Sequence, residues 1–266
     1  KSKPYFQKIP SDHDSHSLKE LKGKYLLLDF WSSGCGPCIM SFPELKELSE
    51  QMKESLEVVS ISQDSDNAWR KASARHGITW KNWNDLKLGN GIFTDFGVRG
   101  IPHYFIISPE GKIVASQIGY SKGLLKYVLL PKYLDLENKT TLYRSEEGKQ
   151  IIDYPTVTEN NINCMYIRTV ELTDKSTDVT FKVFYNPNMW VRIADTSHLI
   201  TDGGERLPIS KATGITLNKE TFMPESGTIE FTLHFPALPQ GCSSFSYYEE
   251  NVPNGWNIKG IKVKKM

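Results

Sequence analysis

The chain has 266 residues, enough for about two domains that each bury a core of their own. Its 32 Lys and Arg residues balance 31 Asp and Glu residues, so a formal net charge of +1 provides no whole-chain field for gathering polyanions, and nucleic acid is not an expected partner. A hydrophobic fraction of 39% and a charged fraction of 24% argue against disorder, and no apolar run approaches the ~18 residues that span a bilayer.

The chain begins at Lys1, and no basic stretch leads into an apolar segment near its start. We therefore expect that any signal peptide or membrane anchor has already been removed, and the native N-terminus stays open.

Strand-like and helix-like patterns alternate between residues 24 and 136, which predicts an α/β layer structure with parallel pairing. Residues 24–31 read KYLLLDFW, a continuous apolar run expected of a central strand covered on both faces. Apolar residues then recur at helical spacing over 39–52, with Pro43 as a kink. The other elements expected here are strands at 56–62, 104–107 and 112–116 and helices at 67–76 and 121–133.

Beyond about residue 137 the hydrophobic period changes to two, as over 179–185 and 229–235. Turn clusters recur between these segments, which predicts an all-β, Ig-like sandwich of about 110 residues. A change of phase across Gly260 indicates a bulge in the last strand. The predicted division is a first domain at 1–136, a linker at 137–150 and a β-sandwich domain of unknown role at 151–266.

The sequence Cys35-Gly36-Pro37-Cys38 lies between the strand at 24–31 and the start of the following helix. A helix N-terminus favours an anion, so we expect a lowered pKa at Cys35 and assign it as the nucleophile. Cys38, one turn further on, is placed to close an intramolecular disulfide. The alternative is a chance C-x-x-C or half of a zinc site, but zinc needs a second ligand pair and Cys164 and Cys242 belong to the other domain, so no metal is expected.

Asp29 is an acid inside an apolar strand, where burial should raise its pKa. The alternative interpretation is a carboxylate that is simply hydrogen-bonded to nearby backbone groups.

Residues 15–135 resemble the thioredoxin superfamily, which implies a thioredoxin-like fold. That resemblance implies that Asp29 accepts the proton of the resolving cysteine, Cys38. It also implies that Pro43 is the proline that kinks the active-site helix. The stretch GVRGIP at 97–102 resembles the loop that carries a cis-proline, here Pro102, opposite the cysteines. In the family the backbone before that proline pairs with an extended substrate peptide. The substrate-binding residues implied in this way are Trp31, Gly36, Pro37, Ile101 and Pro102.

Within the superfamily the chain resembles the extracytoplasmic TlpA/ResA branch. Two features carry this resemblance: an insertion at residues 63–90 and the sequence FIISPEGKIV at residues 105–114. The second domain resembles the β-sandwich appended to such proteins in Bacteroidetes. This branch implies a periplasmic or otherwise extracytoplasmic location, with an anchor in a missing N-terminal segment as one arrangement. It also implies partners of two kinds, namely substrate proteins with disulfides or thiols and a membrane-embedded thiol electron donor.

Several residues depart from the family pattern. Gly34 replaces a tryptophan before the first cysteine, Gly36 replaces a frequent glutamate, and Ser60 stands where thioredoxin has a lysine paired with the buried acid. His103 follows Pro102 where threonine is more usual. Its imidazole either stabilises the Cys35 thiolate as a cation or faces outward from a strand.

The leading interpretation is a thiol:disulfide oxidoreductase without a cofactor that reduces disulfides in extracytoplasmic proteins through Cys35 and Cys38. A binding or scaffold protein with a partner-recognising sandwich is one alternative. A peroxiredoxin-like peroxidase is another, although Pro37 and Cys38 directly follow Cys35 here. Pairing of Cys164 with Cys242 stays open, and Trp190 and Trp256 are interpreted as core or interface residues.

Overall fold

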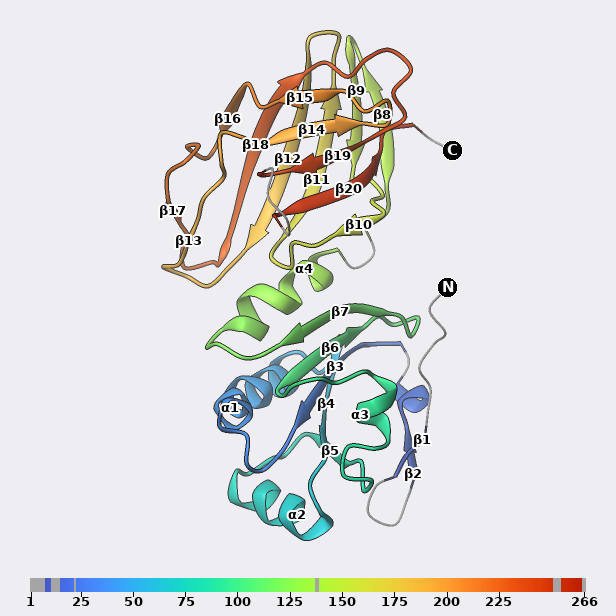
Figure 1. Ribbon diagram of the computed structural model, residues 1–266, viewed down its shortest axis with the longest axis vertical. Coiled ribbons are helices and arrows are strands. Elements are labelled where there is room, and N and C mark those ends of the chain that lie inside the picture. Colours follow the sequence, from blue (N-terminus) through green and yellow to red (C-terminus); the bar gives the residue numbers. More distant parts are fainter. Residues whose placement is uncertain (1–7, 11–14, 22, 137–138, 251–254, 265–266) are drawn as a thin grey trace. The chain divides into compact units, whose positions relative to one another are not determined.

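The computed structural model describes residues 8–10, 15–21, 23–136, 139–250 and 255–264 (Figure 1). The chain divides into two compact units, Lys1–Lys126 and Tyr127–Met266. An α/β unit is followed by a largely all-β unit, which confirms the predicted fold class.

The first unit is built on a five-stranded sheet with the order β5-β4-β3-β6-β7. Strands β3, β4 and β5 are parallel, whereas β6 and β7 pair antiparallel to their neighbours. The strands of this sheet are β3 (Tyr25–Trp31), β4 (Leu56–Ser62), β5 (Lys81–Asn84), β6 (His103–Ile107) and β7 (Ile113–Ile118). The other elements of the unit are β1 (Lys8–Pro10), β2 (Ser15–Ser17), the 3₁₀ helix η1 (Leu18–Leu21), α1 (Gly36–Gln51), α2 (Asp66–Arg75) and α3 (Ile92–Asp95).

The central strand β3 is buried on both faces because successive side chains point to opposite sides of a strand. Leu28 and Phe30 join a core cluster with Phe93 of α3. Trp31 points to the other face, where its ring meets Phe42 of α1 edge to face. Helices α1 and α3 therefore cover opposite faces of the sheet (Figure 1), and Asp29 shares the α1 face with Trp31.

The predicted last helix at 121–133 is irregular. Residues Leu124–Leu129 form a π-helix, η2, and only Leu130–Asp135 form α-helix, α4. Pro131 explains part of this irregularity, because it has no N–H to donate to the carbonyl four residues earlier and its ring crowds that turn.

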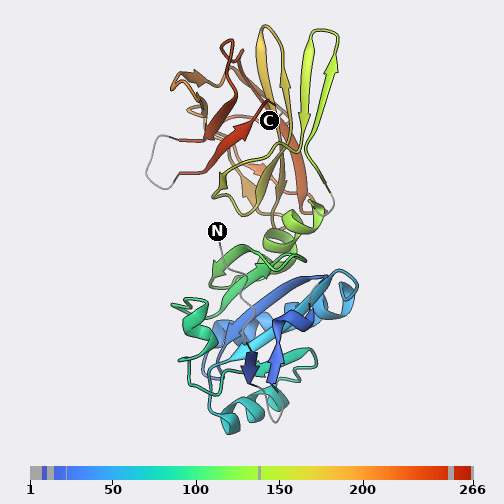
Figure 2. The same cartoon turned by 90° about the vertical axis from the view of Figure 1, so that its right-hand side faces the viewer.

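The second unit contains a five-stranded and a six-stranded antiparallel sheet, which lie as two layers in Figures 1 and 2. Phe181 and Tyr247 come from different sheets, and their ring centroids are 4.9 Å apart, so the two sheets share one core. The six-stranded sheet consists of β16 (Lys211–Thr213), β18 (Thr228–Pro236), β12 (Ser176–Phe184), β11 (Met165–Leu172), β9 (Lys149–Asp153) and β8 (Leu142–Glu146). The five-stranded sheet consists of β10 (Glu159–Asn160), β20 (Asn257–Lys262), β19 (Ser244–Tyr248), β14 (His198–Thr201) and β15 (Arg206–Pro208). A separate ribbon pairs β13 (Trp190–Val191) with β17 (Thr221–Phe222).

Strand β8 and the start of β9 occupy half of the segment 137–150 that the sequence predicts as a linker. The charged residues of this segment predict exposure to solvent, and β8 is indeed exposed. It is an edge strand of the six-stranded sheet, where charged side chains are compatible with strand pairing. The bulge predicted at Gly260 is present, since the register of β19 and β20 shifts there. Gly260 has a φ of +61°, and a Cβ at this position would lie 2.3 Å from the Thr158 hydroxyl oxygen.

Candidate active site

Cys35 and Cys38 form a disulfide at the start of α1, with a Cα–Cα distance of 5.3 Å. Cys35 is the N-cap of the helix, and its Sγ accepts a hydrogen bond of 3.2 Å from the backbone N–H of Cys38. Cys35 is half-buried, whereas Cys38 is fully buried. An incoming thiol or disulfide can therefore reach Cys35 but not Cys38, and the exposed backbone N–H groups of the helix start favour a thiolate at Cys35.

The loop that leads to Cys35 is held by Asp64, a residue not predicted from the sequence to belong to the site. The backbone N–H of Ser33 donates to Asp64 Oδ2 over 2.6 Å, and the Ser62 hydroxyl donates to the same oxygen over 2.9 Å. Asp64 follows β4, so it links the ends of two neighbouring parallel strands. An aspartate two residues after a serine at a strand end was the available signal.

Asp29 is fully buried on the α1 face of the sheet, and burial raises its pKa to about 7. Its Oδ2 accepts a hydrogen bond of 2.8 Å from the hydroxyl of Ser60 on β4. That hydroxyl in turn accepts a hydrogen bond of 2.8 Å from the indole N–H of Trp80. Asp29 Oδ1 has no hydrogen-bond partner among the described residues. The carboxyl group is therefore held by a side-chain network and titrates near neutral pH.

The Ile101–Pro102 peptide bond is cis, as the family resemblance implies. Pro102 directly precedes β6, which runs antiparallel to β3 with His103 opposite Phe30. The cis-proline and the loop after β3 therefore lie at the same edge of the sheet. Ile101 is half-buried and packs against the core cluster, and Pro102 is buried.

The surface around the disulfide is open. Gly34, Gly36 and Pro37 are exposed, and a Cβ placed on either glycine would have no atom within 4 Å. Trp31, which the resemblance implies as a substrate contact, has no exposed surface, and its indole N–H donates to Asn82 Oδ1 over 3.2 Å. In this structure its side chain forms part of the core beneath the site.

His103 fits neither of the two predicted alternatives. It is 4% exposed on β6, its Nε2 lies 2.7 Å from the Ser116 hydroxyl, and its ring centroid lies 4.2 Å from that of Phe105. Burial lowers its pKa, so the imidazole is neutral at neutral pH. The expectation of a cation or an outward-facing side chain is thus wrong, because β6 is covered on both faces.

The remaining cysteines are unpaired in the structure. Cys164 is buried and Cys242 is half-buried, and each is a free thiol. Across the described ranges no group of three or more His, Cys, Asp or Glu side chains could hold a metal ion.

The known proteins that this chain resembles match its first unit. The Redoxin family profile matches residues 2–127. Thiol-disulfide oxidoreductase ResA of Bacillus thuringiensis (strain Al Hakam) is 31% identical over 121 residues, which cover 45% of this chain and 69% of the relative. Thioredoxin-like protein YneN of Bacillus subtilis (strain 168) is 28% identical over 110 residues, or 40% and 63% of the two chains. Among solved structures, a thiol:disulfide interchange protein DsbE of Chlorobium tepidum is 27% identical with a TM-score of 0.43, covering 47% of this chain and 88% of that one.

Proposed function

The chain belongs to the thioredoxin superfamily as a ResA-like thiol-disulfide oxidoreductase, and we propose that it reduces disulfide bonds in extracytoplasmic proteins through Cys35 and Cys38. The observation that carries this proposal is the pairing of an accessible Cys35 at a helix N-cap with a fully buried Cys38. The Cys35 sulfur is accessible to a protein substrate. The Cys38 sulfur is placed to attack the mixed disulfide and release that substrate.

The reaction begins with the reduced pair. The Cys35 thiolate attacks one sulfur of a substrate disulfide, which forms a mixed disulfide and expels the other substrate sulfur as a thiolate that takes up a proton. The Cys38 thiol then loses its proton and attacks the Cys35 sulfur. This step releases the second substrate thiol and leaves the Cys35–Cys38 disulfide that the structure contains. Two electrons pass from the enzyme dithiol to the substrate.

Asp29 is the proposed acceptor of the Cys38 proton. Its pKa of about 7 suits this task, because a base that titrates near the working pH can both accept and release a proton. It lies on the sheet face that α1 covers, the same helix that carries Cys38. Oδ1, which has no partner among the described residues, is the oxygen open to a proton.

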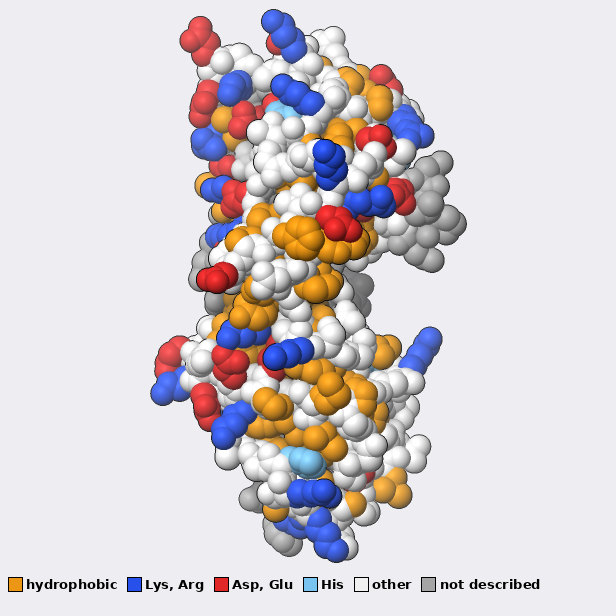
Figure 3. Space-filling model, turned by 90° about the vertical axis from the view of Figure 1, so that its left-hand side faces the viewer, with side chains coloured by type: hydrophobic (Ala, Val, Ile, Leu, Met, Phe, Trp, Pro, Cys, Tyr) orange, Lys and Arg blue, Asp and Glu red, His pale blue; other side chains and the backbone are white. Residues whose placement is uncertain are grey.

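The proposed substrate surface surrounds Cys35. Ile101 and Pro102 would hold an extended segment of the substrate by its backbone, and the exposed Gly36 and Pro37 leave room for it. Met40, two residues after Cys38, is 67% exposed. Figure 3, which views the side on which α1 lies, shows hydrophobic side chains gathered on the surface of the first unit. Such a surface suits a protein substrate.

The location and the electron donor are proposed from the family. A membrane-embedded thiol protein would regenerate the dithiol, and an anchor ahead of Lys1 would hold the chain near it. The described part of the chain has no helix that is long and apolar enough to cross a membrane.

The test is the redox equilibrium of the Cys35–Cys38 pair over a dithiothreitol or glutathione series, read by thiol alkylation and mass, with Cys35→Ser as the control. A reduction potential near or below about −250 mV would support a reductant. A value near about −120 mV would overturn the proposed direction and indicate an oxidase. Absence of any reversible two-electron transition would contradict the redox function itself.

A further inference from the structure

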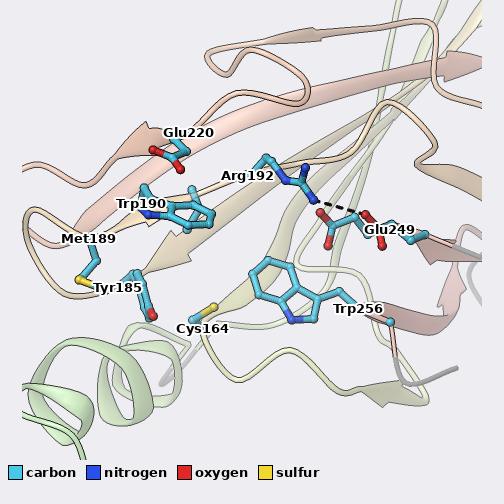
Figure 4. Close-up of a pocket in the computed structure, with 11 residues that line it drawn as sticks. Cys164, Tyr185, Met189, Trp190, Arg192, Glu220, Glu249 and Trp256 are labelled. Atoms are coloured by element: carbon cyan, nitrogen blue, oxygen red, sulfur yellow. Dashed lines mark ion pairs between the residues drawn. The ribbon is translucent and has the colours of Figure 1, made fainter. Parts of the chain in front are cut away.

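The second unit contains a cavity that the redox chemistry does not use. It has a volume of about 610 Å³, and all the residues that line it belong to this unit (Figure 4). Its aromatic walls come from three separate places in the chain: Tyr185 follows β12, Trp190 lies in β13 and Trp256 precedes β20. Trp190 is 44% exposed, so its ring is open to solvent as well as to the cavity.

The charged residues that line the cavity are mainly acidic. Glu220 precedes β17, Glu249 and Glu250 follow β19, and Arg192 is the cavity's single basic residue within the described chain. Arg192 and Glu250 form an ion pair of 3.6 Å (Figure 4). Neither Glu220 nor Glu249 forms an ion pair with any residue that the structure describes. The charge of Arg192 also acts on Glu249 and lowers its pKa, so this one guanidinium is shared by Glu249 and Glu250, and the three carboxylates of the cavity outnumber its single cation.

Glu249 is more buried than Glu220. One of its oxygens accepts a hydrogen bond of 3.2 Å from the backbone N–H of Ala194. Burial raises its pKa to about 6, yet the group is still mostly ionised at neutral pH. A cation in the cavity would compensate for the lost hydration of this carboxylate.

We propose that the cavity binds an organic cation on an apolar stem, as carried by an arginine or lysine side chain of another polypeptide. Aromatic ring faces attract cations because the faces carry negative charge, and tryptophan does so most strongly. No described Lys or Arg side chain lies over the rings of Tyr185, Trp190 or Trp256. Met189 and Val191 supply apolar lining for the stem of such a side chain.

The rim of the cavity favours a polypeptide over a small free cation. Phe222 pairs with Trp190 in the β13–β17 ribbon and is 62% exposed, and Met189 is 45% exposed. Exposed apolar side chains beside a charged cavity suit the neighbouring residues of a peptide, because burying them adds to the attraction of the central cation.

The test is a titration of the full chain with the peptide acetyl-Gly-Arg-Gly-amide, followed by the indole N–H signals in NMR spectra. We expect the signals of Trp190 and Trp256 to shift, while those of Trp31 and Trp83 in the core of the first unit stay in place. A peptide with neutral citrulline in place of arginine should bind at least about tenfold more weakly. Equal binding of the two peptides, or no binding at millimolar concentration, would overturn the proposal.

Variants distinguish binding in the cavity from a general attraction of the cationic peptide to negative charge on the protein. Trp256→Leu and the double variant Glu220→Gln/Glu249→Gln should each weaken binding by about threefold or more. The matched control is Glu205→Gln/Glu225→Gln, which makes the same charge change at two exposed glutamates outside the cavity and should bind as the parent does. If both double variants weaken binding equally, the proposed site is wrong. Trp190→Leu replaces the first variant should Trp256→Leu fail to fold.

Choline and a neutral disaccharide complete the experiment. Tighter binding of the arginine peptide than of choline supports a basic segment of a polypeptide as the occupant. Tighter binding of choline would support the cation site but overturn the polypeptide as its source. A disaccharide that binds more tightly than both would overturn the cation site altogether.

Discussion

The Ser60 hydroxyl donates a hydrogen bond of 2.8 Å to Oδ2 of Asp29, and both side chains are fully buried. The direction of this bond is set by Trp80, whose indole N–H can only donate and gives its proton to the Ser60 oxygen. The single hydroxyl proton of Ser60 is then directed at Asp29. A hydrogen bond to the carboxylate favours the ionised form and so opposes the effect of burial.

Replacing Ser60 by Ala should therefore raise the pKa of Asp29 above its present value of about 7. A hydrogen bond to a charged group contributes about 1.5–3 kcal/mol, so the expected increase is about one pKa unit or more. The measurement is a pH titration of the Asp29 carboxyl carbon by NMR in the oxidised protein. Ser62→Ala is the matched control, because that serine lies on the same strand but donates to Asp64. An unchanged or lowered Asp29 pKa in Ser60→Ala would contradict this account.

The raised pKa of Asp29 also makes folding stability depend on pH. The folded pKa lies above the value of 3.8 that an aspartate has in an unfolded chain, so the folded state holds this proton more tightly than the unfolded state does. The stabilising contribution of the protonated acid is fully present below about pH 4 and is lost as the pH rises to about 7. Ionisation at higher pH then costs up to about 4 kcal/mol.

Asp29→Asn removes this titration while keeping the shape of the side chain. Its stability relative to the parent should increase between pH 5 and pH 8, measured by urea unfolding of the oxidised proteins. Comparing the two pH values cancels any fixed cost of the substitution itself. A stability difference that does not change with pH would show that Asp29 is already ionised in the folded protein at pH 5.

Much of the candidate active site could be predicted from the sequence, because its residues are adjacent in the chain or lie in a recognisable local pattern. The pair Cys35 and Cys38, the acid Asp29 inside an apolar strand and the turn before Pro102 are all visible in short segments. Only the family resemblance indicates Ser60 as the neighbour of Asp29, since no short segment contains both residues and they meet through the parallel pairing of β3 with β4. The Trp80 indole N–H completes the network from outside both strands.

Side-chain burial was harder to predict than the elements themselves. Continuous apolar strands are covered on both faces, so the pattern does not say which neighbour each residue meets. Trp31 and His103 were expected near the substrate or near solvent, and both are buried with polar partners, Asn82 and Ser116. Short elements such as β5 and α3 were not predicted, because four residues are too few to establish a period.

Glu44 of α1 links the active-site helix to residues 120–126, which include the first turn of η2. Its carboxylate accepts from the Tyr120 hydroxyl at 2.7 Å and from the backbone N–H groups of Gly123 and Lys126 at 3.0 and 2.6 Å. Because Glu44 is 8% exposed, Glu44→Ala leaves these donors poorly solvated and should destabilise the protein by about 2–4 kcal/mol in urea unfolding. Glu47→Ala breaks only the exposed pair with Lys126 and should cost about 1 kcal/mol or less. Equal losses in the two variants would show that Glu44 has no such linking role.

Thiol reactivity should differ sharply among the four cysteines of the reduced protein. Burial raises the pKa of Cys164 to about 11, so only about one molecule in a thousand carries its thiolate at pH 8. Alkylation by iodoacetamide at pH 8, followed by peptide mass analysis, should label Cys35 at least about a hundredfold faster than Cys164.

Labelling in 6 M guanidinium is the control for that experiment, since unfolding should make all four thiols react. Rapid labelling of Cys164 in the folded protein, or recovery of a Cys164–Cys242 disulfide peptide, would contradict the buried free thiol in the structure. Slow labelling of Cys164 would also simplify the redox titration, because a change of two alkyl groups in short labelling times could then be assigned to Cys35 and Cys38 once Cys242 is replaced by Ser.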